Sequence, residues 1–153
     1  MEEDYRTRLR KMFLAVNRID GLYYRAAKRM GIKENTLTLL YALDDGTIHS
    51  QKQICEEWLI PRTTLNTIVK ECVEKGYIVL SVEGHTKEKN ICLTPKGKVF
   101  AETVYRNIYR AEEEAMRLTA RDFSFDFIRA IETFADYLQE NFNQYVTSYK
   151  DSP

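Results

Sequence analysis

The segment from Pro61 to Gly76, PRTTLNTIVKECVEKG, gathers side chains whose hydrogen-bonding groups match those that nucleic acids present. An arginine guanidinium binds guanine O6 and N7 together, an asparagine amide matches adenine, and a threonine offers a hydroxyl to phosphate or a methyl to thymine. Threonine and asparagine are poor helix formers, so helix formation alone does not explain their presence on a helix. The side chains available for contacts to bases or phosphates are Arg62, Thr63, Thr64, Asn66, Thr67 and Lys70.

The same segment carries clear helix signals. Pro61 suits a first helical position, and Gly76 suits the residue just past the end. We therefore expect a helix over residues 61–75 whose polar face points outward, although Thr64 could equally face inward. A solvated helix face with an arginine near its cap is the alternative interpretation. The apolar residues that recur at three- and four-residue spacing are Leu65, Ile68, Val69, Cys72 and Val73.

The remaining sequence predicts the elements that must position this helix. Apolar spacing, caps and turn residues predict helices over residues 4–30, 33–43, 51–58, 61–75, 95–118 and 123–149. β-branched and aromatic runs predict strands over residues 47–49, 77–82 and 90–93. The fold class is therefore mainly α with a small β-hairpin. Two short consecutive helices followed by a hairpin form the arrangement of a winged helix-turn-helix.

Length and composition restrict the class of protein further. The 153 residues suffice for one domain, or for a compact core with helical extensions. No long apolar run predicts a transmembrane helix, and the charged N-terminus MEEDYRTRLRK lacks the apolar stretch of a signal peptide, so we expect a cytoplasmic protein.

The residues that commonly serve catalysis or metal binding are sparse. Cys55, Cys72 and Cys92 are odd in number and outside any CxxC spacing, which favours three reduced, mostly buried thiols. His49 and His85 lie apart from clustered carboxylates or cysteines. We therefore expect no enzyme activity, no metal and no cofactor.

The formal net charge of zero conceals an uneven distribution. Residues 1–33 hold nine Lys and Arg against four Asp and Glu, and residues 62–98 hold seven against four. Residues 99–153 hold six against ten and are acidic. Because phosphates meet one face of a protein, local charge matters more than the total, and two segments are locally basic.

The ordered set of motifs resembles the MarR family of winged-helix transcriptional regulators over most of the chain. The stretch SQKQICEEWLIPRTTLNTIVKECVEKGYI is similar to that family's helix-turn-helix, and ICLTPKGKVFAE is similar to its strand followed by Leu-Thr-x-x-Gly and a long helix. The resemblance implies a DNA-binding regulator in which the helix after Pro61 enters the major groove.

The hairpin loop departs from the family pattern. The family usually carries Asp-x-Arg there, with the arginine in the minor groove, whereas this sequence has His85 and Lys87 at those positions. A lysine neutralises phosphate but does not reproduce a planar guanidinium. His85, Lys87 and Lys89 are therefore candidate contacts to DNA, with the two lysines suited to phosphate, and loop solubilisation by the lysines is the alternative interpretation.

The ends of the chain carry apolar faces that need a partner, which predicts a homodimer. We expect residues 1–32 and 95–153 to dimerise and residues 33–94 to form the DNA-binding domain. The apolar residues concerned are Phe13, Val16, Ile19, Phe123, Phe127, Ile131, Phe134, Leu138 and Phe142.

The family resemblance also implies a small-molecule pocket between the first, second and fifth helices. Aromatic side chains suited to it are Tyr23, Tyr41, Tyr105 and Tyr109, with ordinary core and dimer packing as the alternative. The predicted function is a ligand-responsive repressor that binds a pseudo-palindromic operator as a dimer and responds to a small aromatic or amphipathic effector. The alternative is a winged-helix module for protein–protein interaction without DNA binding.

Overall fold

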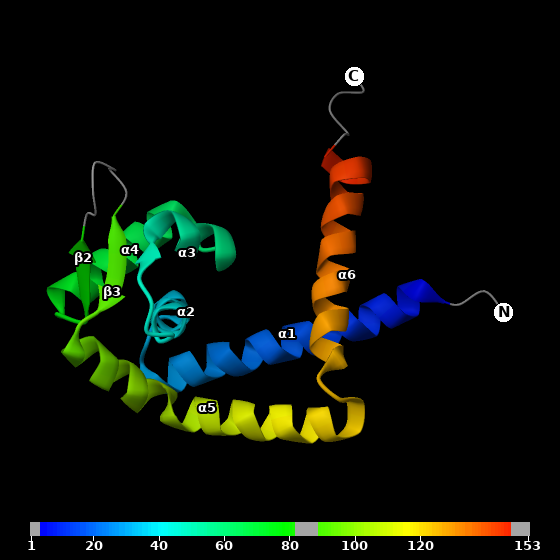
Figure 1. Ribbon diagram of the computed structural model, residues 1–153, viewed down its shortest axis with the longest axis horizontal. Coiled ribbons are helices and arrows are strands. Elements are labelled where there is room, and N and C mark those ends of the chain that lie inside the picture. Colours follow the sequence, from blue (N-terminus) through cyan, green and yellow to red (C-terminus); the bar gives the residue numbers. More distant parts are fainter. Residues whose placement is uncertain (1–3, 82–88, 148–153) are drawn as a thin grey trace. The chain divides into compact units, whose positions relative to one another are not determined.

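The computed structural model describes residues 4–81 and 89–147 and shows a mainly helical chain with a three-stranded antiparallel sheet (Figure 1). The predicted order of elements is confirmed. The elements are α1 Tyr5–Met30, α2 Glu34–Leu43, β1 His49–Ser50, α3 Gln51–Glu57, α4 Arg62–Glu74, β2 Ile78–Ser81, β3 Asn90–Leu93, α5 Pro95–Phe123, α6 Asp126–Phe142 and a π-helical turn Asn143–Thr147.

The chain divides into two compact units, Met1–Arg106 and Asn107–Pro153, and the division falls within α5. None of the helices in the described ranges is long and apolar enough to span a membrane.

Helix α1 begins and ends where its sequence signals place it. The Asp4 carboxylate caps the first turn by accepting a hydrogen bond from the Thr7 backbone N–H at 3.1 Å. Gly31 ends the helix in the left-handed region, with φ of 66°, a conformation that glycine adopts without strain. Within α1, all of whose residues are described, Ala27 is the buried residue, so most of this helix is open to solvent.

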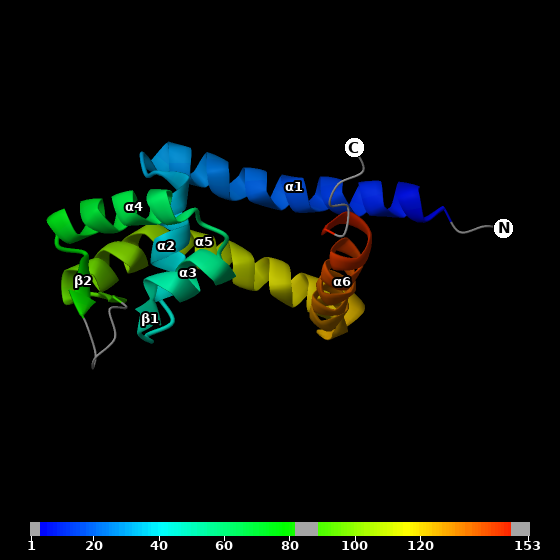
Figure 2. The ribbon, with the colours of Figure 1, turned by 90° about the horizontal axis from the view of Figure 1, so that it is seen from above.

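Helix α2 forms the centre of the first unit. In both views it lies between α1 and α3 (Figures 1 and 2). Its residues Leu39 and Leu40 are fully buried, and Ile54 of α3 and Leu65 of α4 join them in the core. Tyr41 is 38% exposed and lines a pocket described below.

The sheet has the strand order β1-β3-β2, with Ile78 opposite Leu93 and His49 opposite Ile91. Strand β3 matches its prediction. The first strand was predicted over residues 47–49 but runs from His49 to Ser50. The reason is local: the Asp45 carboxylate accepts the Thr47 backbone N–H at 2.9 Å, which holds residues 45–47 in a turn.

The last two helices differ from their predicted limits. Helix α5 continues to Phe123, past residue 118, and the Thr119 hydroxyl donates to the Ala115 carbonyl at 2.8 Å within the helix. The break comes at Ser124, whose φ is 55°. Helix α6 then ends at Phe142 and gives way to the π-helical turn; the predicted continuation to residue 149 falls partly outside the described residues.

Candidate nucleic-acid interface

Helices α3 and α4 are joined by a tight turn that fixes the start of α4. Ser50 and Gln53 form the predicted capping box at the start of α3. In the turn, Ile60 is buried in the core, whereas Leu59 is 84% exposed and has a φ of 50°. Pro61 was predicted to be the first helical residue of α4, but it is the N-cap residue of this helix. The buried Ile60 therefore anchors the turn while α4 begins one residue later than expected.

Helix α4 presents one apolar and one polar face, as its sequence predicts. Leu65, Ile68, Val69 and Cys72 are buried, whereas Val73, also predicted to face inward, is 39% exposed. Burial raises the pKa of the Cys72 thiol. The apolar face therefore fixes the orientation of the helix and leaves the opposite face to solvent.

The polar face of α4 holds most of the predicted contact residues. Arg62 and Asn66 lie four residues apart and are both exposed, as are Thr63, Thr67 and Lys70. The Thr67 hydroxyl donates to the Thr63 carbonyl at 3.1 Å, which leaves the hydroxyl oxygen able to accept a further bond. The remaining predicted residue of this helix, Thr64, is half-buried.

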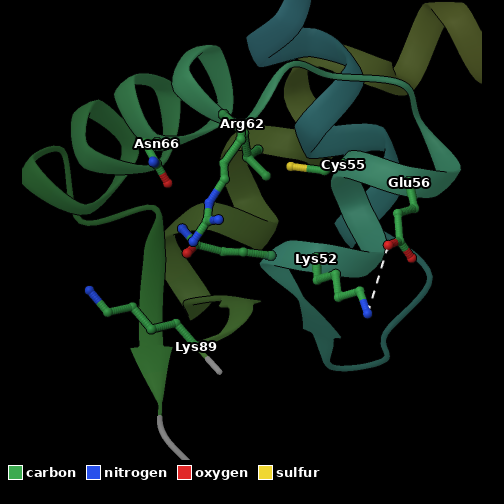
Figure 3. Close-up of a pocket in the computed structure, with 8 residues that line it drawn as sticks. Lys52, Cys55, Glu56, Arg62, Asn66 and Lys89 are labelled. Carbon is green, nitrogen blue, oxygen red and sulfur yellow. Dashed lines mark ion pairs between the residues drawn. The ribbon is translucent and has the colours of Figure 1, made fainter. Parts of the chain in front are cut away.

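A hollow of about 520 Å³ opens beside the polar face of α4 (Figure 3). Arg62 and Asn66 extend into it from α4, with Lys89 directly before β3 and Lys52 on α3 around it. A backbone hydrogen bond of 3.1 Å from Gln51 N–H to the Lys89 carbonyl holds these two segments together. The full lining is Gln51, Lys52, Cys55, Glu56, Arg62, Leu65, Asn66 and Lys89.

The charge of this hollow is positive. Three cations, Lys52, Arg62 and Lys89, face one carboxylate, Glu56, which pairs with Lys52 at 3.9 Å. Within the described part of the chain, the side chains of Arg62 and Asn66 have no hydrogen-bond or ion-pair partner. Their donors are therefore available to an external ligand with acceptor groups.

Two of the predicted contact residues, His85 and Lys87, lie outside the described residues. Lys52 and Gln51 were not predicted as part of the interface. The sequence did contain one signal for these two residues: the capping box at Ser50 and Gln53 places Gln51 and Lys52 in the first turn of α3, directly before α4 in the motif. Cys55 was predicted to be a reduced, mostly buried thiol, but it is half-buried and lines the hollow.

A second pocket, of about 540 Å³, lies within the first unit. It brings together Tyr23, Tyr41 and Tyr105, three of the four predicted tyrosines; Tyr109 belongs to the second unit and is not among its lining residues. Trp58, which was not predicted, also lines it. We call this the aromatic pocket; its lining is Asp20, Tyr23, Glu34, Leu37, Thr38, Tyr41, Trp58 and Tyr105.

The helix-turn-helix followed by the β2–β3 hairpin defines a winged helix-turn-helix protein. Residues 30–87 match the model of the MarR family. Over this segment the chain is similar to the MarR family of transcriptional regulators. Among curated proteins, comparison by sequence finds no match.

Solved structures share the fold over nearly the whole chain. NMB1585, a MarR family regulator from Neisseria meningitidis, is 19% identical with a TM-score of 0.72, over 94% of this chain and 99% of that one. A putative MarR family regulator from Listeria monocytogenes, solved with a 26mer DNA, is 19% identical with a TM-score of 0.65, over 95% and 97%. NadR in complex with 4-hydroxyphenylacetate is 12% identical with a TM-score of 0.66, over 84% and 89%.

Proposed function

We propose that this chain is a sequence-specific DNA-binding regulator, a ligand-responsive repressor that acts in the cytoplasm as a homodimer on a pseudo-palindromic operator. The observation that carries the proposal is the set of unpaired donors of Arg62 and Asn66 on the exposed face of the second helix of the helix-turn-helix. In this motif the second helix enters the major groove, where a guanidinium binds guanine and an amide binds adenine.

Lys89 and Lys52 supply the complementary contacts to phosphate. Both are exposed, and both border the hollow into which Arg62 extends. Lys70 continues the row of Arg62 and Asn66 by one further helical turn. In the proposed complex it contacts the phosphate backbone of the DNA. Such contacts position a protein on the duplex without reading its sequence. The Listeria monocytogenes regulator, which shares the fold, was solved with a 26mer DNA, and this supports the proposal.

Exposed apolar side chains support the homodimer. No residue of α6, all of which is described, is buried, and Ile131 is 62% exposed. On α1, Phe13 and Ile19 are 47% and 53% exposed. We propose that residues 1–32 and 95–153 dimerise and residues 33–94 bind DNA. A two-fold dimer then presents its recognition helices about 34 Å apart, one turn of DNA. Occupation by such a dimer of an operator that overlaps a promoter would exclude polymerase sterically, which suffices for repression.

The aromatic pocket supports the ligand response. Trp58 lines this pocket and is also the residue that ends α3, directly before the turn into α4. A ligand that moves Trp58 therefore acts on the turn that orients the recognition helix. NadR, which shares the fold, was solved with the small aromatic 4-hydroxyphenylacetate.

Selection of bound sequences from a random duplex library, followed by affinity measurement at several salt concentrations, tests the proposal. We expect an inverted repeat and an affinity that falls steeply with salt, because binding releases counterions. Absent binding, or binding that salt does not weaken, would overturn the DNA-binding role and favour a protein-interaction module.

Substitution of Arg62 tests the base contact. We expect Arg62→Ala to weaken binding to the selected site by about 10- to 100-fold and to relax the preference at one base pair. Lys89→Ala should weaken binding to all sequences alike and reduce the salt slope by about one. Arg106→Ala, which removes an exposed arginine outside the hollow, is the matched control and should leave the base preference unchanged. An unchanged preference in Arg62→Ala contradicts the assignment.

A further inference from the structure

The aromatic pocket carries negative charge. Asp20 of α1 and Glu34 of α2 both line it, and its described lining residues include no lysine, arginine or histidine. The pocket therefore combines two carboxylates with four aromatic rings. This combination bears on the charge of the ligand and not only on its shape.

These two carboxylates are not neutralised by neighbouring side chains. Among the described residues, neither Asp20 nor Glu34 forms an ion pair. Lys33 lies next to Glu34 in the sequence, but its ammonium binds the Glu71 carboxylate of α4 at 2.5 Å. Glu34 lies in the first turn of α2, where the helix dipole stabilises a negative charge without cancelling it. An anionic ligand would therefore meet uncompensated like charges.

Two of the four aromatic residues of the pocket remain partly exposed. Tyr41 packs edge to face against Trp58 and against Tyr105, with ring centroids 5.5 Å apart in each pair. Trp58 and Tyr41 are 37% and 38% exposed, whereas Tyr105 is buried and its hydroxyl donates to the Leu37 carbonyl. The buried, hydrogen-bonded Tyr105 packs against Tyr41, and Tyr41 and Trp58 are partly open to solvent.

We propose that the aromatic pocket binds an organic cation, an amine or quaternary ammonium with an apolar body, in preference to an aromatic carboxylate. A cation over the face of Trp or Tyr is attracted by the ring quadrupole, most strongly by Trp. The negative charges of Asp20 and Glu34 attract the same cation. The volume of about 540 Å³ lies within the range of small-molecule sites.

The ligand class stands apart from DNA binding, because the pocket residues belong to α1, α2, α5 and the end of α3 and not to the polar face of α4. The regulatory consequence, a cation that changes operator affinity through Trp58, rests on the proposed function. Ligand binding measured without DNA tests the ligand class. Ligand binding measured with operator DNA present tests the regulatory consequence. Failure of one is therefore distinguishable from failure of the other.

The experiment uses the full chain and three probes of similar size. These are benzyltrimethylammonium, its uncharged carbon analogue neopentylbenzene, and phenylacetate. Trp58 is the single tryptophan of the chain, so its fluorescence reports the pocket directly, with calorimetry as an independent measure. We expect the cation to bind at least about tenfold more tightly than the neutral analogue, and phenylacetate to bind most weakly. Equal affinity for all three, or a preference for phenylacetate, overturns the proposal.

Isosteric substitutions then locate the charge. Asp20→Asn and Glu34→Gln should each weaken cation binding by about threefold and together by about tenfold, while affinity for neopentylbenzene stays constant. Glu102→Gln, which changes an exposed carboxylate outside the pocket, is the matched control and should change neither. Should a pocket variant fail to fold by circular dichroism, the comparison of the three probes on the unmodified chain still decides. Cation binding that survives both substitutions unchanged refutes the role of the carboxylates.

Discussion

Gly97 lies at the contact between the start of α5 and the residue before β2, and we predict that alanine there disrupts the fold. Gly97 is buried, and a Cβ atom at this position would lie 1.9 Å from the Tyr77 carbonyl oxygen and 2.8 Å from its carbon. Ordinary van der Waals contact begins at 3.4 Å, so the two segments would have to separate by about 1.5 Å. Both opposing atoms are backbone, so no side-chain rotation relieves the clash.

The magnitude follows from what that separation breaks. Thr94 N–H donates to the Tyr77 carbonyl at 3.0 Å, and Gly97 N–H donates to the Thr94 hydroxyl at 2.9 Å. Overpacking of a well-packed site costs about 1–3 kcal/mol, and loss of these bonds adds to it. We expect Gly97→Ala to lower the free energy of unfolding by about 3 kcal/mol. That corresponds to a melting temperature lower by about 6–12 °C for a chain of this length.

Gly21 provides the matched control, because it is also a helical glycine. A Cβ there meets only the flexible end of Arg25, at 3.3 Å, so alanine fits. Gly21→Ala should raise the free energy of unfolding by about 1 kcal/mol through helix propensity. Urea unfolding followed by circular dichroism, at one protein concentration, measures both. Equal stability of Gly97→Ala and the unmodified chain would refute the close approach of α5 to Tyr77.

Two further predictions concern capping and pH. Thr94→Val should lower the free energy of unfolding by about 1 kcal/mol, because the Thr94 hydroxyl caps α5 by accepting the Gly97 N–H. Thr94→Ser keeps this hydroxyl and should retain most of the stability. Comparable urea midpoints for the two variants would contradict the capping role. The pKa of Asp45 is lowered from 3.8 to about 2. The largest cause is the hydrogen bond from the Thr47 backbone N–H, and the next is the hydrogen bond with His49. Its contribution to stability is therefore present above pH 3.8 and lost as the pH falls through about 2. Melting temperatures of Asp45→Asn and the unmodified chain should converge over that interval, and a constant difference down to pH 2 would contradict the assignment.

The parts of the fold that the sequence predicted well rest on local chemistry. Gly31 and Gly76 both adopt positive φ directly after a helix or its cap, and the hydroxyl of Ser50 caps α3 as expected. Each of these signals acts over three or four residues, so spacing alone reveals it. The predicted end of a helix at residue 118 was wrong, because Thr119 bonds the preceding turn inside α5 and spacing alone does not reveal this.

The candidate sites depend on contacts between distant segments, and that limits what spacing predicts. Lys52 and Lys89 are 37 positions apart yet border one hollow with Arg62, and Trp58 meets Tyr105 through Tyr41. The sequence predicted Arg62 and Asn66 because both belong to one amphipathic helix. It did not predict Trp58, whose place in the pocket is set by tertiary packing and not by helical period.

Leu59 offers a position at which the protein can be engineered. A non-glycine residue in the left-handed region costs about 1–2 kcal/mol, and 84% exposure means that its side chain returns little by packing. Asparagine adopts this conformation more readily, and position 59 lies outside the hollow and outside the aromatic pocket. Substitution of Leu59 by asparagine should therefore stabilise the turn between α3 and α4 without changing any residue of the hollow or of the aromatic pocket. Destabilising changes in α4 that broaden its repertoire of partners become tolerable once this one residue has been exchanged.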